Sequence, residues 1–568
     1  VKEPMNVATA NRETALQLLC KLYEPDVAQA VLQQIWQRLP DGRQAPGSKR
    51  NDCMIISYAD SISAEGEVPL QTLRRFLSIH VGDTFGRLHL LPFFPSSSDD
   101  GFAVIDYRMV DHHVGGWRDI EDLAQDYDLM FDLVINHCSR ESLWFADFIN
   151  GRDPGRHYFI TLPEESDVSA VMRPRSSPLI SAVHTYGGIR HVWNTFSEDQ
   201  IDLDFSNPKV LLEFVDILML YIDRGAKLIR LDAIAFLWKS LGSNCMSLPE
   251  THAVVKLLRL LIDEVCPHVR LITETNVPHD ENVSYFGNGD EAHVVYQFSL
   301  APLLLYSFVF GDGTYLTNWA ARLAPPPAGT KFLNFIASHD GIGLRPLEGL
   351  MPPDSITRLV DKMHARGGFV TMRDAGDNEQ RPYEINISLM SAFGGEQGVP
   401  AYLAAHALLV SFRGMPALYI HSLLGTLNDI SLVEQTGRTR SINRSRWQLH
   451  ELHEALADQA SLHARVFKDL LQLIERRNAQ PALQPHCVQE VIPTLSGVFA
   501  MRRSCSEQTL LIVCSLLDVP QQLSLQEFDL LPGTYFDRLH QAPIKLEDEL
   551  ELAPYQVRWL QLDPPLRP

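Results

Sequence analysis

The chain has 568 residues and a formal net charge of −21, with 45% hydrophobic and 21% charged residues. These fractions are typical of a globular protein, and the length exceeds what one compact core usually holds, so we expect two or three domains. The negative charge argues against nucleic acid or an anionic membrane as a partner, because both are bound through basic patches. A small anion in a cleft is still compatible, since exposed charges are screened beyond about 8 Å at physiological ionic strength.

Targeting signals are not visible. No apolar stretch approaches the roughly 18 residues that a membrane-crossing helix needs, and no basic region followed by an apolar core opens the chain. The eight cysteines show no CxxC pair and no metal-ligand spacing, a pattern typical of a reducing compartment. We therefore expect a cytoplasmic protein with no metal and no cofactor. The sequence leaves the oligomeric state open, a homodimer included.

Residues 1–50 are predicted to form a helical extension that packs on the main domain. The spacing of one helix face appears in Val27, Val31, Ile35 and Leu39. A linker containing proline and glycine follows this helix and predicts a flexible joint.

Eight short apolar runs, bounded by polar or turn residues, alternate with helical patterns from residue 53 onward. Such runs are typical of strands buried on both faces. Their alternation with helices implies parallel strands and right-handed crossovers. The runs are 54–60, 87–92, 129–137, 227–232, 270–274, 293–297, 333–339 and 417–420. We therefore predict the α/β class and a (β/α)8 TIM barrel.

Two connections are too long for simple crossovers, and long loops in compact domains are often functional. Residues 139–207, after the third strand, are predicted to form an inserted domain, and residues 341–384, after the seventh, a lid. The barrel would then comprise residues 51–138 and 208–484. Short alternating strands with turn signals predict a C-terminal antiparallel β-domain over residues 485–568.

Three predicted strands have a carboxylate at or just past their end, namely Asp232, Glu274 and Asp340. A TIM barrel places its chemistry at this end of its strands. One alternative is purely structural: Arg230 and Asp232, two apart on one strand face, would form an ion pair that plugs the mouth of the barrel. The two further carboxylates in similar positions favour a catalytic site.

Four segments resemble the sequence regions of the α-amylase superfamily, family 13 of the glycoside hydrolases. They are Asp132-Leu-Val-Ile-Asn136-His137, Arg230-Leu-Asp232-Ala, Glu274 after Leu-Ile-Thr, and His339-Asp340. Other segments resemble the sucrose phosphorylase subfamily, namely the run from Leu91 to Phe102, His339-Asp340-Gly341-Ile342-Gly343 and Ser441-Ile442-Asn443-Arg444. Within it, Pro382-Tyr-Glu-Ile-Asn386 and the helical extension resemble the glucosylglycerate phosphorylase branch.

The resemblance implies a retaining reaction, which needs two carboxyl groups about 5 to 5.5 Å apart. It implies that Asp232 is the nucleophile, ionised beside Arg230, and that Glu274 is the protonated acid that later serves as base. Asp340 would hold the sugar hydroxyls and stabilise the cationic ring. Substrate binding is implied for His137 and His339, and for Asp99 and Arg444, which would pair across the far edge of a single glucose. Phosphate contacts are implied for Arg175 and Tyr383.

Two departures from sucrose phosphorylases lie where the acceptor is expected. Phe236 replaces their usual tyrosine and Glu384 replaces a glutamine in the lid, so both are implied in substrate binding and both argue against sucrose. A glycerate carboxylate also needs a cation. The candidates are Arg373, Arg381 and Lys239, although each is more simply explained as a solvated charge.

The resemblance therefore implies reversible phosphorolysis of α-glucosylglycerate to α-D-glucose 1-phosphate and glycerate, with a small sugar and inorganic phosphate as partners. Phosphorolysis of sucrose or glucosylglycerol is an alternative, and so is a transglucosidase or hydrolase of the same family. A fourth alternative is a catalytically inactive barrel that serves as a binding module. The intact Asp232, Glu274 and Asp340 argue against it.

Overall fold

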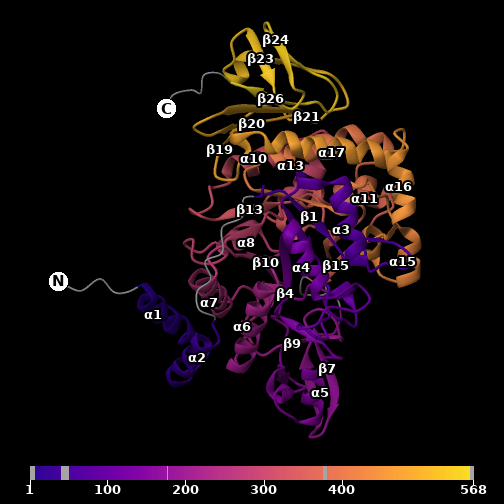
Figure 1. The fold of residues 1–568 in the computed structure, drawn as a ribbon. Coiled ribbons are helices and arrows are strands. Elements are labelled where there is room, and N and C mark those ends of the chain that lie inside the picture. The colour runs from indigo at the N-terminus through magenta and orange to yellow at the C-terminus, as the bar shows by residue number, and fades with distance from the viewer. Residues whose placement is uncertain (1–6, 40–49, 176, 375–379, 563–568) are drawn as a thin grey trace, which may run out of the picture.

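A computed structural model describes residues 7–39, 50–175, 177–374 and 380–562. Its centre is a closed barrel of eight parallel strands in the order β1-β17-β13-β12-β11-β10-β4-β3 (Figure 1). The strands are β1 Met54–Ser57, β3 Arg87–Leu90, β4 Asp128–Val134, β10 Ala226–Asp232, β11 Arg270–Thr273, β12 Val294–Tyr296, β13 Lys331–Asn334 and β17 Met415–Tyr419. The predicted (β/α)8 barrel is confirmed.

Helices cover the outside of the barrel. α9 (Leu300–Phe310) and α13 (Val399–Ser411) are apolar around most of their circumference, which is typical of helices covered on more than one side. α13 contacts α9, β17 and the C-terminal sheet, which explains its composition. The other barrel helices are α3 Pro69–His80, α4 Trp117–Asp126, α6 Pro208–Asp223, α7 Pro249–Val265, α8 His279–Ser284, α10 Thr314–Arg322, α12 Leu389–Ala392, α14 Ile420–Leu423, α15 Ile430–Thr436, α16 Leu449–Ala457 and α17 Leu462–Asn478.

The third and seventh strands end earlier than the apolar runs predicted. β4 ends at Val134, and the seventh strand, β13, ends at Asn334 instead of His339. In the segment that follows β13, side chains bind the backbone in place of a neighbouring strand. Asn443 donates to the carbonyls of Ser338 and Asp340 at 3.1 and 3.2 Å. The chain therefore leaves the sheet where the polar site begins.

The N-terminal extension contains α1 (Val7–Leu19) and α2 (Pro25–Arg38). α1 packs against α7, and α2 against α6. The buried face of α2 consists of Ala28, Val31, Leu32 and Ile35. Val31 and Ile35 of the expected face are therefore buried, whereas Val27 is 40% exposed. Most of the predicted linker lies outside the described residues.

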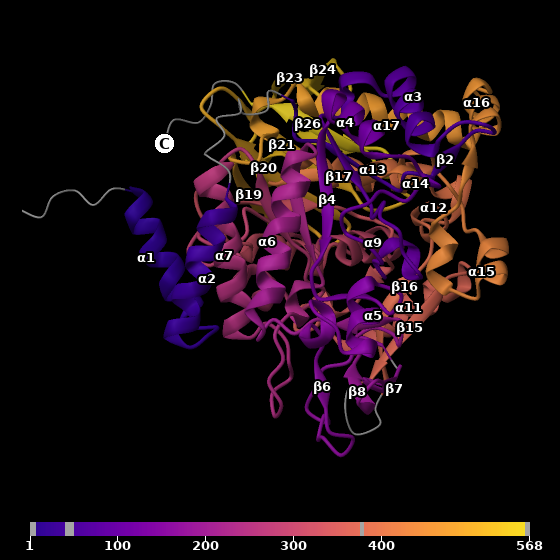
Figure 2. The ribbon, with the colours of Figure 1, turned by 60° about the horizontal axis from the view of Figure 1, so that its bottom comes forward.

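The two long connections form small antiparallel sheets. Between β4 and α6 lie β5 (His137–Ser139), paired with β9 (Gln200–Asp202), then α5 (Leu143–Asn150) and the sheet of β6 (Thr161–Leu162), β7 (Ile180–Thr185) and β8 (Gly188–Trp193). Figure 2 shows β6, β7 and β8 projecting from the barrel. After β13 come β14 (Ile342–Gly343), α11 (Pro353–Ala365), β15 (Phe369–Asp374) and β16 (Gln380–Asn386), with the sheet order β14-β16-β15.

The C-terminal region is an antiparallel β-structure with its own apolar cluster. One sheet has the order β19-β20-β21-β26-β23-β24, and β22 pairs with β25. The bounds are β19 Val488–Ile492, β20 Val498–Ser504, β21 Thr509–Ser515, β22 Gln521–Ser524, β23 Gly533–Asp537, β24 Ala542–Leu546, β25 Glu549–Leu552 and β26 Val557–Gln561. It packs on α13 at the end of the barrel opposite to β6–β8 (Figure 1).

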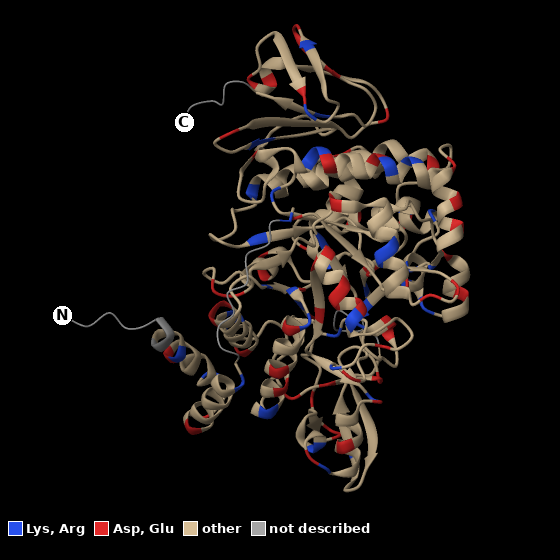
Figure 3. Cartoon of the chain, in the orientation of Figure 1, with Lys and Arg blue, Asp and Glu red and all other residues tan. Residues whose placement is uncertain are grey.

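Charged residues of both signs are interspersed over the whole described chain (Figure 3). Within the described ranges, no helix combines the length and the apolar character required to cross a bilayer.

Candidate active site

The three predicted carboxylates meet at the carboxyl ends of the barrel strands. Asp232 is the last residue of β10, Glu274 follows β11 directly, and Asp340 follows β13 after a short segment. Ala233 has a left-handed backbone (φ 53°), and its amide donates to Oε2 of Glu274 at 3.1 Å. The sharp turn after β10 thus links the first two carboxylates.

Arg230 lies at the centre of these acids and is 1% exposed. Its Nη1 donates to Oδ1 of Asp232 at 2.7 Å and also contacts Asp132. Its Nη2 lies 3.8 Å from Glu274 Oε2 and 4.0 Å from Asp340 Oδ2. One guanidinium therefore brings the three carboxylates together. The ion pair between Arg230 and Asp232, expected under the structural alternative, is also present.

The pKa values of the carboxyl groups around Arg230 are shifted in different directions, because burial and neighbouring charges oppose each other. Burial raises the pKa of Asp232 well above its usual range, and the charges of Glu274 and Asp132 add to this while Arg230 opposes it. Burial also raises the pKa of Glu274, and Asp340 adds to it. Asp132 behaves differently, because Arg230 and His89 outweigh its burial and lower its pKa to about 2.

Asp340 is held in its charged form. Burial opposes this, but His339 and then Arg440, Arg230 and Arg444 lower its pKa well below the usual range. Burial itself lowers the pKa of His339 to about 3. His339 is therefore neutral at pH 7, and the arginines supply the positive charge that keeps Asp340 ionised.

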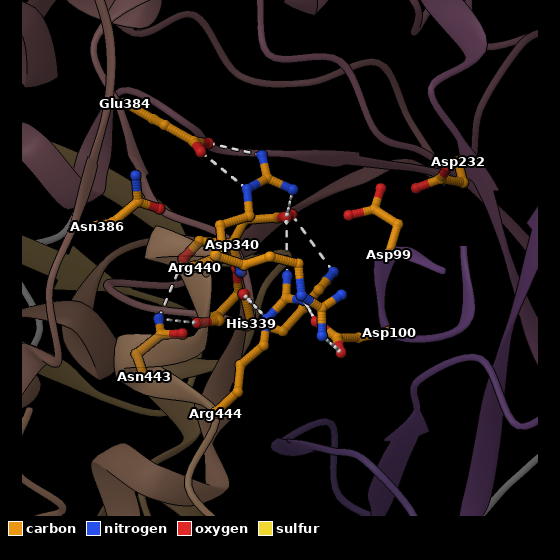
Figure 4. A network of polar contacts seen from close by, with 12 residues as sticks. Asp99, Asp100, Asp232, His339, Asp340, Glu384, Asn386, Arg440, Asn443 and Arg444 are labelled. Carbon is orange, nitrogen blue, oxygen red and sulfur yellow. Dashed lines mark hydrogen bonds and ion pairs between the residues drawn. The ribbon is translucent and has the colours of Figure 1, made fainter. Parts of the chain in front are cut away.

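Arg440 joins Asp340 to the lid. Figure 4 shows its guanidinium between the carboxylates of Asp340 and Glu384. Nη1 lies 2.9 Å from Asp340 Oδ1, and Nε and Nη2 donate to the two oxygens of Glu384 at 2.8 and 2.7 Å. Glu384 is 3% exposed and the Arg440 side chain 23%, so the acid of this bidentate pair is almost fully desolvated and the guanidinium partly so.

The expected pair of Asp99 with Arg444 is not formed. Arg444 contacts the neighbouring Asp100 and donates from Nε to the carbonyl of His339 at 2.8 Å. Asp99 instead accepts from Arg175 at 3.0 Å and from Gln200 at 3.1 Å. The physical reason is that Arg175 and Gln200 hold the carboxylate of Asp99, while the carboxylate of the adjacent Asp100 reaches Arg444.

Both predicted histidines contact Phe102, His339 through its ring and His137 through its backbone carbonyl. The ring of His339 stacks on that of Phe102 with centroids 5.1 Å apart. His137 Nε2 lies 3.1 Å from the Phe102 carbonyl and 3.1 Å from the amide of Gln200. Burial lowers the pKa of His137 to about 4, so it is also neutral at pH 7.

One pocket lies over this end of the barrel. It is lined by Asp99, His137, Arg175, Arg230, Asp232, Phe236, Glu274, His339, Asp340, Tyr383 and Glu384. All predicted site residues except Arg444 therefore face one space. Arg444 lies behind it and lines a neighbouring pocket with Asp100 and Tyr58.

Two of the three cations suggested as partners for a ligand carboxylate, Lys239 and Arg373, form ion pairs with acids of the chain. Lys239 contacts Asp202 at 2.6 Å, Asn136 at 2.6 Å and the carbonyl of Phe236. Arg373 contacts Glu348 at 2.6 Å and is 4% exposed. Neither is a solvated charge, which corrects that part of the expectation. The exposed Arg381 is the third candidate.

Sequence reasoning missed Arg440 and Gln200, which line the pocket. Arg440 stands four residues before Arg444, in a segment with three arginines, and that density next to a recognised motif was the available signal. Gln200 carries no such signal, since only the pairing of β5 with β9 brings it to His137.

One cluster of metal-ligand type occurs in the described residues, at Asp111, His112 and His113. It lies on an exposed loop after β3 and does not line the pocket of the three carboxylates. This cluster is therefore separate from the site of the three carboxylates.

Comparison with known proteins agrees with this geometry. Residues 84–312 match the family described as alpha amylase, catalytic domain. Glucosylglycerate phosphorylase of Allomeiothermus silvanus is 42% identical over 93% of this chain and 94% of that protein, and the Escherichia coli protein of the same name is 40% identical over 92% and 94%. Sucrose phosphorylase of Streptococcus mutans is 30% identical over 76% and 88%.

Among solved structures, sucrose 6F-phosphate phosphorylase from Thermoanaerobacter thermosaccharolyticum superposes with a TM-score of 0.73 at 26% identity, covering 89% of this chain and 99% of that one. The barrel and its carboxylate site thus define a member of the α-amylase family, glycoside hydrolase family 13. Within it, at 40 to 43% identity over most of the chain, the protein belongs to the family of the glucosylglycerate phosphorylases.

Proposed function

We propose that the protein catalyses the reversible phosphorolysis of α-glucosylglycerate to α-D-glucose 1-phosphate and glycerate, with retention of configuration. The main support for this proposal is that the carboxylates of Asp232 and Glu274 both lie within 4 Å of the Arg230 guanidinium and line the same pocket. Asp232 is near Nη1 and Glu274 near Nη2 of Arg230. This placement is compatible with the roughly 5 to 5.5 Å between the two carboxyl groups of a retaining enzyme.

In the first half-reaction, Asp232 attacks the anomeric carbon while Glu274 gives its proton to the glycosidic oxygen, so glycerate leaves and a glucosyl-aspartate ester forms. In the second, a phosphate oxygen attacks the same carbon, Glu274 takes the proton from phosphate, and the ester bond to Asp232 breaks. Two inversions give net retention.

This assignment needs the proton on Glu274 and the charge on Asp232. Both pKa values are raised by burial, so the two acids compete for a proton. The direct 2.7 Å hydrogen bond from Arg230 favours the charged form of Asp232. Glu274 is 3.8 Å from the same guanidinium and is the better proton carrier. Asp340, kept ionised by the arginines, would stabilise the cationic ring of the transition state.

The remaining assignments follow from the pocket. Asp99, His137 and His339 would hold the glucose hydroxyls, and Arg444 would act through Asp100 at the closed end. A pocket closed there suits a single glucose and disfavours a polymer. Arg175 and Tyr383 would hold phosphate, although Arg175 must then be shared with Asp99.

Phosphorolysis of sucrose or glucosylglycerol is the second candidate, since relatives with those names are 30 to 31% identical. Phe236 and Glu384 favour the first candidate, because both depart from sucrose phosphorylases on the acceptor side. We also propose a cytoplasmic location, which the cysteine spacing supports.

The test is to incubate the protein with glucose 1-phosphate and, separately, glycerate, glycerol, fructose or water, and to measure phosphate release. We expect release to depend on glycerate. Equal release with water alone would identify a hydrolase, and preferential release with fructose or glycerol would identify the second candidate.

A further inference from the structure

Arg345 is a buried guanidinium without an acidic partner. It is the first residue of the 3-10 turn Arg345–Leu347, directly after β14, and it is 6% exposed. Among the residues that the structure describes, its hydrogen-bond acceptor is the sulfur of Met246, 3.7 Å from Nη1. Its Nε is buried and has no partner, and no described carboxylate lies within ion-pair distance of it.

Such an arrangement is unfavourable unless something completes it. A buried charge needs a partner, and a thioether sulfur is only a weak acceptor. Arginine cannot relieve the cost by losing its proton, because its pKa is too high. A lone buried guanidinium beside a ligand pocket therefore indicates that the ligand supplies the anion.

Arg345 borders the proposed acceptor side of the pocket from two directions. On one side, the amide of Leu344 donates to the carbonyl of Tyr383 at 2.9 Å, which ties the turn to the lid strand β16. On the other side, Met246 belongs to an apolar cluster with Ala235 and Phe236, and both of these line the pocket. Arg345 therefore lies behind residues that line the pocket, in contact with the Met246 sulfur of this cluster.

Four other cations around the site already have carboxylate partners. These pairs are Arg175 with Asp99, Lys239 with Asp202, Arg373 with Glu348, and Arg440 with Asp340 and Glu384. A second anionic ligand would therefore have to displace an existing pair at each of them. At Arg345 it would displace only the contact with Met246, whose flexible side chain can move aside.

We propose that Arg345 binds the carboxylate of the acceptor and thereby selects an acidic acceptor, such as glycerate, over a neutral one. The proposal rests on the proposed phosphorylase function. Phosphate is the other oxyanion that enters this pocket and has related chemistry, so the experiment must separate the two.

The test compares Arg345→Gln with Arg373→Gln, a matched control because Arg373 is also buried and also contacts a methionine sulfur, that of Met172. With glucose 1-phosphate as donor, we expect Arg345→Gln to raise the KM for glycerate at least about tenfold, the loss typical of a charge-assisted hydrogen bond. The KM for phosphate in phosphorolysis, and hydrolysis without acceptor, should change less than about twofold. Arg373→Gln should leave the KM for glycerate within about twofold.

Two results would overturn the proposal. An unchanged KM for glycerate, in a variant with the melting temperature of the wild type, would show that Arg345 has only a structural role. An equal rise in the KM for phosphate would show that Arg345 binds phosphate. If Arg345→Gln does not fold, Arg345→Lys replaces it in the test. A smaller increase in the KM for glycerate is then expected, because lysine keeps the charge and loses only the planar fork of the guanidinium.

Failure of the proposed function would be recognised separately, in the wild type, as phosphate release that does not depend on glycerate. In that case, calorimetric titration of glycerate and of inorganic phosphate into wild type and Arg345→Gln shows which anion Arg345 binds, without the need for turnover. Glycerate binding that is lost in the variant supports the proposal, and its absence from the wild type overturns it.

Discussion

Both carboxylate oxygens of Glu384 accept hydrogen bonds from Arg440, at 2.8 and 2.7 Å, while the third nitrogen of the same guanidinium lies 2.9 Å from Asp340 (Figure 4). The lid strand thus fixes the orientation of a charge that acts on a carboxylate at the barrel mouth. A glutamine in place of Glu384 offers one acceptor instead of two and no negative charge.

We therefore expect Glu384→Gln to lower kcat/KM by about tenfold or more, because a charge-assisted hydrogen bond contributes about 1.5–3 kcal/mol. Steady-state phosphate release from glucose 1-phosphate with glycerate measures it. Glu348→Gln is the matched control, since it breaks a lid ion pair in which the acid is 38% exposed, and it should change kcat/KM less than twofold. Equal effects of the two variants would contradict a role for Glu384 in orienting Arg440.

Replacing the proposed nucleophile should remove turnover. Asp232→Ala is expected to lower kcat by about 10⁴-fold or more, as loss of a nucleophile does in other covalent mechanisms. The control is Asp111→Ala, which changes an acid outside the pocket and should leave kcat unchanged. A wild-type rate in Asp232→Ala would exclude Asp232 as the nucleophile.

Arg175 is expected to govern the use of phosphate. Arg175→Ala should raise the KM for phosphate at least about tenfold, because an arginine–phosphate contact is charge-assisted. Hydrolysis of glucose 1-phosphate without acceptor should fall less. Its pairing with Asp99 at 3.0 Å adds a second effect, namely a modest rise in the KM for the glucosyl donor. An unchanged KM for phosphate would place the phosphate site elsewhere.

Stability should decrease as the pH falls below about 6.5. Burial lowers the pKa of His137 and His406 to about 4 and of His339 and His421 to about 3. The unfolded chain binds these protons near pH 6.5 while the folded chain does not, so each group costs about 2 kcal/mol between pH 6.5 and 5. Urea unfolding at several pH values measures the slope, and His406→Gln should reduce it by one group. A slope that this variant leaves unchanged would contradict the assignment.

Lys239 should stabilise the fold and have no part in binding the acceptor. Lys239→Met leaves the buried Asp202 unpaired, and breaking a buried pair costs about 3–5 kcal/mol. The control Lys545→Met breaks a pair with Glu547 in which Lys545 is 74% and Glu547 75% exposed, so it should cost about 1 kcal/mol or less. Thermal or urea unfolding compares them. A selective rise in the KM for glycerate without destabilisation would restore Lys239 as a ligand residue.

Local patterns determined the barrel and the identity of its acids. Apolar runs alternating with helices specify parallel strands, since each strand must be covered on both faces, and the residue at the end of a strand is then placed without further information. For this reason Asp232 and Glu274 could be located from the sequence, and the resemblance supplied their proposed roles. Asp340 reaches the same site although β13 ends at Asn334, six residues before it.

The tertiary structure decided which charges pair. The sequence does not tell whether Arg444 reaches Asp99 or Asp100, or whether Lys239 faces a ligand or Asp202. These pairs join side chains from segments far apart in the chain, and the periodicity of a segment carries no information about its distance from another segment. In the sequence, Arg440 is marked only by the arginines around it, and Arg345 by nothing. Only the folded chain shows that the first is held by two acids and that the second is buried with none, because burial and partnership are properties of the assembled pocket and of no single segment.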